Sequence, residues 1–146
     1  MKNILIILSF IFLSTACKKG EDNNEFVFEI NLIDVTPTSV EEFIDIVFIE
    51  VGYKHSSASV GLFHPDSLSV EVQDSRLNSP DYYFLSPLSP PNNSMVNIQG
   101  TLILEVGSPF LLGLGNTETL TYTIRIIDRE NNSSNFITTP QITVYR

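Results

Sequence analysis

Apolar and polar residues alternate with a period of two through most of the chain after residue 24, as expected for β-strands with one buried face. The clearest stretch is residues 66–74, where Leu68, Val70 and Val72 alternate with polar side chains. Residues 119–128 (TLTYTIRIID) repeat the pattern. No stretch of this region shows a convincing helical period of 3.6 residues. The pattern therefore predicts an all-β domain.

The same alternation predicts five more strands, which gives about seven in all, over residues 25–34, 42–51, 82–85, 95–106 and 141–145. Residues 42–51 are apolar on both faces, which predicts a strand covered twice near the middle of the fold. The alternative is a helix that begins at Glu41 and Glu42. Gly100 interrupts a strand and predicts a bulge or a close backbone approach.

Turn residues separate these strands, and their even spacing predicts one antiparallel sandwich of the immunoglobulin or fibronectin type. A small barrel or a jelly roll is the alternative. The chain has 146 residues, which is consistent with one domain after a short leader. Since only one cysteine is present, no disulfide can form within the chain and its hydrophobic core must stabilise the fold.

The N-terminus has the order of features found in a secretory signal. Lys2 precedes an apolar run at residues 4–13, and small residues follow at 14–16. The run of about ten residues is short for a membrane-spanning helix, which needs roughly 20. We therefore expect residues 1–16 to be a signal peptide.

The end of this segment, Ala16 followed by Cys17, resembles a bacterial lipobox, although Ser14 stands where leucine is usual. The resemblance implies cleavage before Cys17 and acylation of that residue. The alternative is a secreted protein with a free thiol. Residues 18–24 are polar and predict a flexible tether that loosely resembles the export signal of Bacteroidetes surface lipoproteins. The expected division is thus 1–16 signal peptide, 17–24 lipidated tether and 25–146 folded domain.

Residues 126–144 (IIDRENNSSNFITTPQITV) resemble the closing hairpin of bacterial immunoglobulin-like domains. The body of the chain is similar to uncharacterised Bacteroidetes lipoproteins, through the lipobox and short motifs such as Pro90-Pro91 and Gly100-Thr101. This resemblance implies an outer-membrane lipoprotein on the periplasmic or the surface face. Those relatives often carry an acidic, glycine-rich loop after the second strand. Residues 52–57 replace it with a loop that contains Lys54 and His55, which argues against a metal site there.

Charge and chemistry exclude several function classes. The formal net charge is −9, and removal of residues 1–16 would leave −10, which disfavours nucleic acid and anionic lipid surfaces as direct partners. His55 and His64 are the only imidazoles, and no spacing joins either to a nucleophile. We expect both histidines at the surface, no enzyme activity and no cofactor. Residues 128–132 predict a turn, with a cation site as the alternative.

Two apolar segments are candidate contact surfaces. Residues 107–115 (GSPFLLGLG) lack strand alternation, so Phe110, Leu111, Leu112 and Leu114 either contact a partner or fold back over one end of the sandwich. Tyr82 and Tyr83 lie beside a proline-rich loop and form either a sugar- or peptide-binding face or part of the core.

One further modification is predicted from a resemblance. Asp66-Ser67-Leu68 resembles the O-glycosylation motif of exported Bacteroidetes proteins, with Ser67 as the acceptor.

These features predict a lipid-anchored, non-enzymatic binding or scaffolding module of the cell envelope, with an envelope protein as its partner. The alternative is an accessory glycan-binding lipoprotein of a nutrient-uptake system. An exposed, coplanar pair among Tyr53, Tyr82, Tyr83 and Phe84 would favour the alternative.

Overall fold

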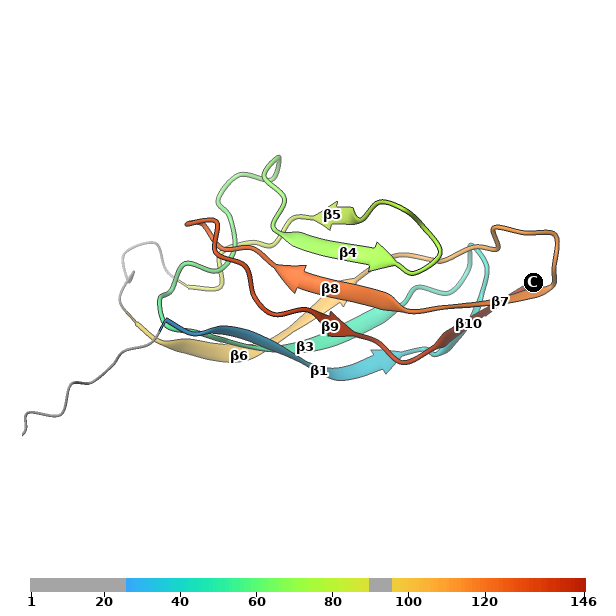
Figure 1. The fold of residues 1–146 in the computed structure, drawn as a ribbon, viewed down its shortest axis with the longest axis horizontal. Helices are drawn as coiled ribbons and strands as arrows, with labels where there is room; N and C mark the ends of the chain where they lie inside the picture. The colour runs from blue at the N-terminus through green and yellow to red at the C-terminus, as the bar shows by residue number, and fades with distance from the viewer. Residues whose placement is uncertain (1–25, 90–95) are drawn as a thin grey trace, which may run out of the picture.

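The computed structural model describes residues 26–89 and 96–146 (Figure 1). The expected signal peptide, Cys17, the tether and the Pro90-Pro91 motif lie outside these residues. Every regular element in the described ranges is a β-strand. None of the described residues belongs to a helix long and apolar enough to cross a membrane. The expectation of an all-β domain is confirmed for this part of the chain.

The described residues form ten strands in three sheets. The strands are β1 (Phe28–Thr36), β2 (Ser39–Glu41), β3 (Phe48–His55), β4 (Val70–Asp74), β5 (Asp81–Tyr83), β6 (Ile98–Glu105), β7 (Thr117–Leu120), β8 (Tyr122–Ile126), β9 (Ile137–Thr138) and β10 (Ile142–Tyr145). Their order is β1-β3-β6, β2-β10-β7 and β5-β4-β8-β9. Neighbours are antiparallel except β2 and β10, which run parallel.

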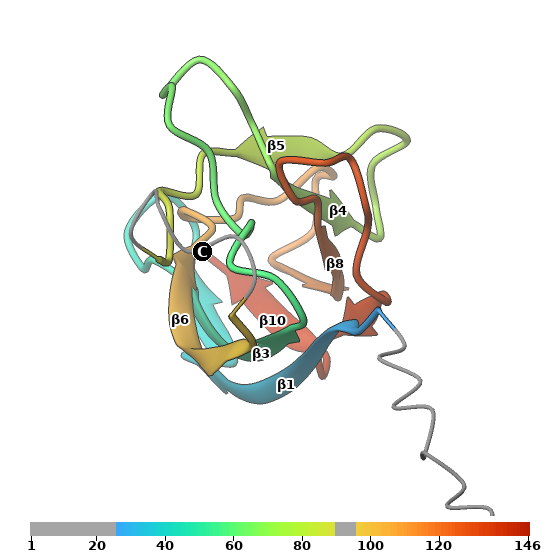
Figure 2. The ribbon, with the colours of Figure 1, turned by 90° about the vertical axis from the view of Figure 1, so that its left-hand side faces the viewer.

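The strands lie in two layers, which gives a sandwich-like arrangement. The sheet β1-β3-β6 forms one layer, and β5-β4-β8 lies over it (Figures 1 and 2). The strand predicted over residues 119–128 breaks at Thr121 into β7 and β8, which belong to different sheets. At this break the Tyr122 N–H donates to Thr139 Oγ1 at 2.9 Å, between β9 and β10. The segments β7–β8 and β9–β10 therefore each pass from one of these two sheets to the other.

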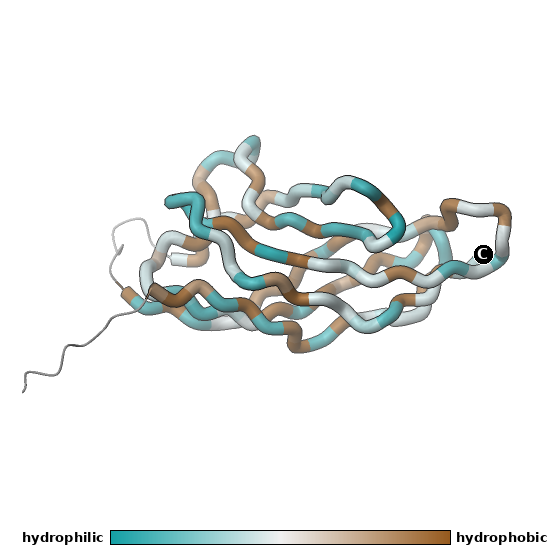
Figure 3. Tube along the Cα trace, viewed as in Figure 1, coloured by the Kyte–Doolittle hydropathy of each residue, from teal (hydrophilic) through white to brown (hydrophobic). Residues whose placement is uncertain are grey.

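The buried face of each strand supplies the core. Figure 3 shows apolar and polar positions alternating along the strands. Inward positions that the sequence predicts correctly include Val70, Val72, Leu102, Leu104, Leu120, Tyr122, Ile124, Ile126, Ile142 and Val144. Each fully buried aliphatic side chain contributes roughly 1.5–3 kcal/mol to folding, so these strands hold the domain together without a disulfide.

The expectation for residues 42–51 is wrong in its first half. Residues 42–44 form a turn, in which Phe43 has φ of 63°, and β3 begins only at Phe48. One face of β3 is buried through Ile49 and Val51, whereas Phe43 and Ile44 are exposed. The backbone of this segment pairs elsewhere, because the Glu42 N–H donates to the Tyr145 carbonyl at 2.8 Å. The segment is therefore neither a doubly covered strand nor a helix.

Two other boundaries differ from the expectation. β3 continues to His55, into the stretch expected to be a loop, and β4 begins at Val70, so that Leu68 is exposed. Gly100 forms no bulge, because it pairs with Tyr53 in regular register. A Cβ atom at Gly100 would lie 2.8 Å from the hydroxyl of Tyr53, so the glycine permits a close approach of that side chain.

Candidate functional site: the apolar end

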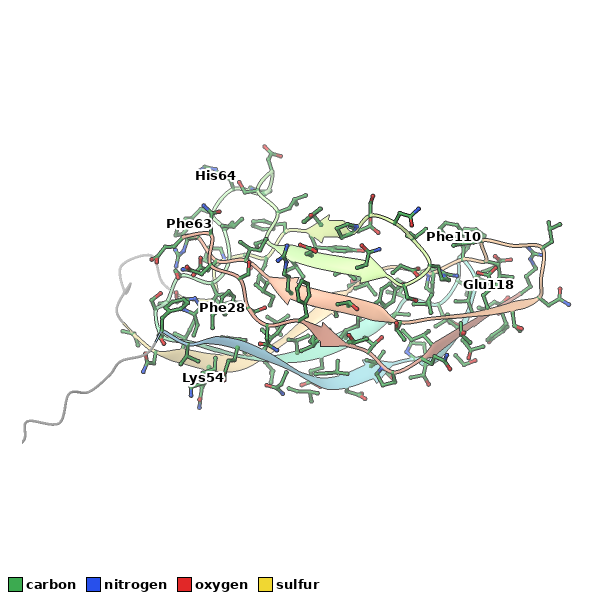
Figure 4. The ribbon with its side chains drawn as sticks, viewed as in Figure 1. Phe28, Lys54, Phe63, His64, Phe110 and Glu118 are labelled. Carbon is green, nitrogen blue, oxygen red and sulfur yellow. The ribbon has the colours of Figure 1, made fainter. Side chains whose placement is uncertain are left out.

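The loop between β6 and β7 forms one end of the domain. Figure 4 labels Phe110 and Glu118 at this end and Phe28, the first residue of β1, toward the other. The loop leaves β6 through Gly107, whose φ of 80° lies in the left-handed region that favours glycine. Its residues 106–116 belong to no strand.

Two carboxylates bind the backbone of this loop. Glu118 accepts the Leu112 N–H at 3.1 Å and the Gly113 N–H at 2.6 Å, and Glu42 accepts the Leu111 N–H at 3.1 Å. These backbone hydrogen bonds lower the pKa of both glutamates below the usual value. The loop has no regular structure, but it is held by one side chain from the strand that follows it, Glu118, and by one from a distant segment, Glu42.

Two arginines complete the network. Arg76 Nη1 donates to the Phe110 carbonyl and to Glu118, both at 2.9 Å. Arg76 also pairs with Asp74 at 2.8 Å, and this hydrogen bond is the main reason that the pKa of Arg76 is raised. Arg146 Nε donates to Glu42 Oε1 at 2.7 Å. The charged side chains at this end are thus paired with one another.

Apolar side chains project from this loop into solvent. The exposed fractions are 44% for Phe110, 46% for Leu112 and 99% for Leu114. The exposed ring of Phe43 stacks on Phe110, with centroids 5.5 Å apart and planes 7° apart. Ile44, next in sequence, is also exposed. We call these five residues, Phe43, Ile44, Phe110, Leu112 and Leu114, the apolar end.

Leu111 does not belong to this surface, although the sequence groups it with its neighbours. It is buried and packs in the hydrophobic core cluster, because the loop backbone turns its side chain inward. Leu111 thus anchors the loop, while Phe110 and Leu112 point outward. Of the two alternatives for this segment, folding back over the sandwich holds for Leu111, whereas a contact surface formed by the exposed Phe110, Leu112 and Leu114 stays a prediction.

One aromatic residue of β5 contacts the start of the loop. The Tyr83 hydroxyl donates to the Val106 carbonyl at 3.3 Å, and burial raises the pKa of Tyr83. Tyr82 and Phe84 are exposed, and Tyr53 packs partly buried against the core. The ring contacts among the described residues are Phe43 with Phe110 and two edge contacts to His55, so they include no coplanar pair from this group.

A second polar cluster corrects the expectation for His55, which is fully buried and not at the surface. Its Nδ1 accepts the Ser57 backbone N–H at 2.9 Å, and its Nε2 lies 3.1 Å from Asp128 Oδ2. Because a backbone N–H only donates, Nδ1 is unprotonated and Nε2 carries the proton. The ring is therefore neutral and donates to Asp128. His64, by contrast, is exposed as expected, and so is Ser67.

Asp128 organises the turn after β8. Its carboxylate accepts the backbone N–H groups of Glu130 and Asn132, each at 2.8 Å, and the Asn132 side-chain amide at 2.9 Å. Burial alone would raise the pKa of Asp128, but these hydrogen bonds outweigh it and lower the pKa. Asn131 adopts φ of 64°, as turn-forming asparagine often does. The expected turn is confirmed, and a cation here would have to displace these donors.

Ser57, His55 and Asp128 are residue types found in nucleophilic triads. The Ser57 hydroxyl lies 3.4 Å from His55 Nδ1 and 2.9 Å from the Ser59 hydroxyl. The Nδ1 lone pair already accepts the Ser57 N–H, and the side chains of His55 and Asp128 are fully buried. This geometry ties β3 to the turn after β8 and presents no base to a substrate. Among the described residues no group of three or more His, Cys, Asp or Glu side chains is placed so that it could hold a metal ion.

Comparison with known proteins gives no relative from which to transfer a function. No family model, no curated protein and no solved structure matches this chain. The functional argument therefore rests on the geometry of the chain itself. Glu42, Arg76 and Glu118, which build the loop at the apolar end, are missing from the sequence-based candidates. They are isolated charged residues, and no motif relates them to residues 107–115.

Proposed function

We propose that this chain is a lipid-anchored, non-enzymatic binding module of the bacterial cell envelope that holds a protein partner at the apolar end. One observation carries the proposal: the exposed Phe43–Phe110 stack sits on a loop whose backbone is fixed by Glu42 and Glu118. An apolar surface on a fixed backbone loses little conformational entropy on binding, which favours affinity. Cys17 supplies the lipid attachment in this proposal, as its lipobox-like context implies.

The strand order supports an immunoglobulin-type fold for this module. Sheet β1-β3-β6 corresponds to the first sheet of such a sandwich, and β5-β4-β8-β9 corresponds to the second. β2 switches to the second layer and runs parallel to β10, the last strand. In domains of this type the connecting loops cluster at the two ends of the sandwich, and loops are where binding residues are concentrated. The apolar end consists of such loops.

The chemistry of the apolar end favours a protein partner over a sugar or a membrane. Exposed aromatic and leucine side chains surrounded by charged groups are typical of the centre and rim of protein interfaces. A sugar needs free polar groups in its plane, whereas Glu42, Glu118 and Arg76 are already hydrogen-bonded within the domain. The apolar end also lies away from the end at which β1 begins, so a lipid-anchored domain would present it away from its own membrane (Figure 4).

Site-specific photo-crosslinking in living cells tests this proposal. A benzoylphenylalanine at position 110 should crosslink to one partner, whereas the same group at Phe136, which is exposed elsewhere, should not. With the partner purified, Phe43→Ser or Leu114→Ser should weaken binding at least tenfold. Equal crosslinking at both positions, or affinity unchanged by both substitutions, would contradict the proposal.

The lipid anchor is tested separately by replacing its only candidate residue. Cys17→Ala should move the protein from the membrane fraction to the soluble fraction. If the variant still fractionates with membranes, the lipid attachment is wrong. Some other attachment would then have to bring the domain to its protein partner.

A further inference from the structure

The outer face of the sheet β1-β3-β6 contains an open hollow of about 740 Å³. Lys54, one of its lining residues, projects from β3 away from the second layer (Figure 4). Val51, which precedes Gly52 on β3, and His55, which follows Lys54, are both fully buried. The even-numbered positions of this strand therefore point outward. The hollow is thus separate from both the core and the apolar end.

The strand register places Gly52 at the centre of this hollow. Gly52 pairs with Asn31 on β1 and with Thr101 on β6. One row further along the same face, Lys54 pairs with Glu29 and Gln99. Directly paired residues have Cβ atoms about 4.5–5.5 Å apart, and same-face neighbours along a strand are about 7 Å apart. Five polar side chains therefore surround a glycine within one small area.

Because Gly52 has no side chain, the Asn31 amide can lie directly over it at the floor of the hollow. A Cβ atom there would lie 2.6 Å from Asn31 Oδ1, so the Asn31 amide lies over the glycine. Ile33, which is exposed beside the bulge in β1, adds an apolar wall. Asn135 closes the edge, because its amide bonds both the N–H and the carbonyl of Ile30, at 2.8 Å and 2.9 Å. The hollow thus has a fixed edge and an open polar interior.

The polar groups of the interior are available to a ligand. The hydrogen bonds and ion pairs between described residues do not involve the side chains of Glu29, Asn31, Lys54, Gln99 or Thr101. Glu29 and Lys54 are directly opposed on adjacent strands and have opposite charges, so they leave no net charge. Asn31, Gln99 and Thr101 can each donate and accept hydrogen bonds.

We propose that this hollow binds a neutral saccharide unit. Each sugar hydroxyl donates and accepts a hydrogen bond, which matches the mixed donors and acceptors around Gly52. A charge-balanced interior does not select an ionic ligand, and Ile33 can pack against the C–H face of a pyranose ring. The site is independent of the apolar end, so the domain would bind a glycan through a sheet face and a protein through its end loops.

Saturation-transfer NMR tests this site on the full chain in lipid nanodiscs. The probes are the methyl glycosides of glucose, galactose, mannose and N-acetylglucosamine, with glucuronate and alanine as charged and zwitterionic comparisons. Gly52→Ala adds a Cβ that would displace the Asn31 amide, one of the polar groups of the hollow, without a change of charge. Gly115→Ala is the matched control, because a Cβ there makes only ordinary contacts, at 3.6 Å or more. Gln99→Ala is a second variant on an exposed position that cannot disturb the core.

We expect saturation transfer to at least one neutral glycoside. Gly52→Ala should weaken that binding at least tenfold, Gln99→Ala should weaken it severalfold, and Gly115→Ala should leave it unchanged. The proposal is overturned if none of the four glycosides receives saturation, or if Gly52→Ala and Gln99→Ala both bind like the control. Transfer to glucuronate or alanine alone would also overturn it and would assign the hollow to an ionic ligand.

Discussion

Phe43 and Phe110 stack with nearly parallel rings although they lie in loops that follow different strands, β2 and β6. The residues beside them are linked as well, because Glu42 accepts the backbone N–H of Leu111. The ring contact and the carboxylate contact therefore join the same two loops side by side. An exposed aromatic pair held in this way is a defined surface and not two independent side chains.

The stack should appear as energetic coupling between the two rings. Phe43→Ala and Phe110→Ala should each cost less than about 1 kcal/mol, since both rings are largely exposed. The double variant should show a coupling of about 0.5–1 kcal/mol, as is typical of aromatic pairs. Urea unfolding measures it, and Phe43→Ala combined with Phe136→Ala is the additive control. Strict additivity of the first pair would show that the stack contributes nothing in solution.

The loop at the apolar end should loosen in acid. Because the pKa values of Glu42 and Glu118 are lowered in the folded state, their stabilisation is present above the unfolded value of 4.5. It is lost as the pH falls below that value and the carboxylates take up protons. The amide shifts of Leu112 and Gly113 should report this transition. In Glu118→Gln the amide shifts of Leu112 and Gly113 should lose this dependence on pH. If they change with pH as in the wild type, a group other than Glu118 takes up the proton that causes the change.

Period-two alternation predicts the core strands correctly because burial on one face is a local property of the chain. It fails at residues 42–47, where an apolar run is not a strand. Glu42 there binds Leu111 and Arg146, which are far away in sequence. Alternation carries no information about such long-range polar contacts. The exposure of Phe43 and Ile44 follows from these contacts and not from the local pattern.

The polar clusters show the same limit. The sequence marks Asp128 and Asn131 as turn residues, because their side chains bond nearby backbone. It gives no sign that His55, 73 positions earlier, packs beneath that turn and donates to Asp128. Gly52 likewise has no local signal, since its importance comes from Asn31 and Thr101 on neighbouring strands. Pairing across strands decides these positions.

Replacement of Asp128 should destabilise the whole domain. Asp128→Asn keeps the shape but turns a donor toward the surrounding N–H groups, which leaves buried donors without an acceptor. We expect a loss of about 3 kcal/mol or more in the free energy of unfolding, measured with urea. Glu130→Ala is the control, because that side chain is exposed in the same turn, and it should change stability by less than about 0.5 kcal/mol. Similar losses for both would mean that the Asp128 carboxylate is not needed to satisfy these N–H groups.

Alanine substitutions at two glycines with similar backbone angles can distinguish the cost of backbone strain from the cost of a steric clash. Gly61 and Gly107 have φ of 85° and 80°, so alanine at either position carries the strain of a left-handed conformation, about 1–2 kcal/mol. Around Gly107 no atom lies within 4 Å of an added Cβ, whereas at Gly61 it would lie 2.2 Å from the Ser86 carbonyl oxygen.

The neighbouring backbone cannot easily retreat at Gly61. The Leu62 N–H donates to the Leu85 carbonyl at 2.8 Å, and the Leu88 N–H donates to the Val60 carbonyl at 3.1 Å, on either side of the contact. Gly61→Ala should therefore cost clearly more than Gly107→Ala, by about 2 kcal/mol or more in urea unfolding. Equal losses would show that residues 85–88 move aside freely, and that the two backbone hydrogen bonds do not fix them against residues 60–62.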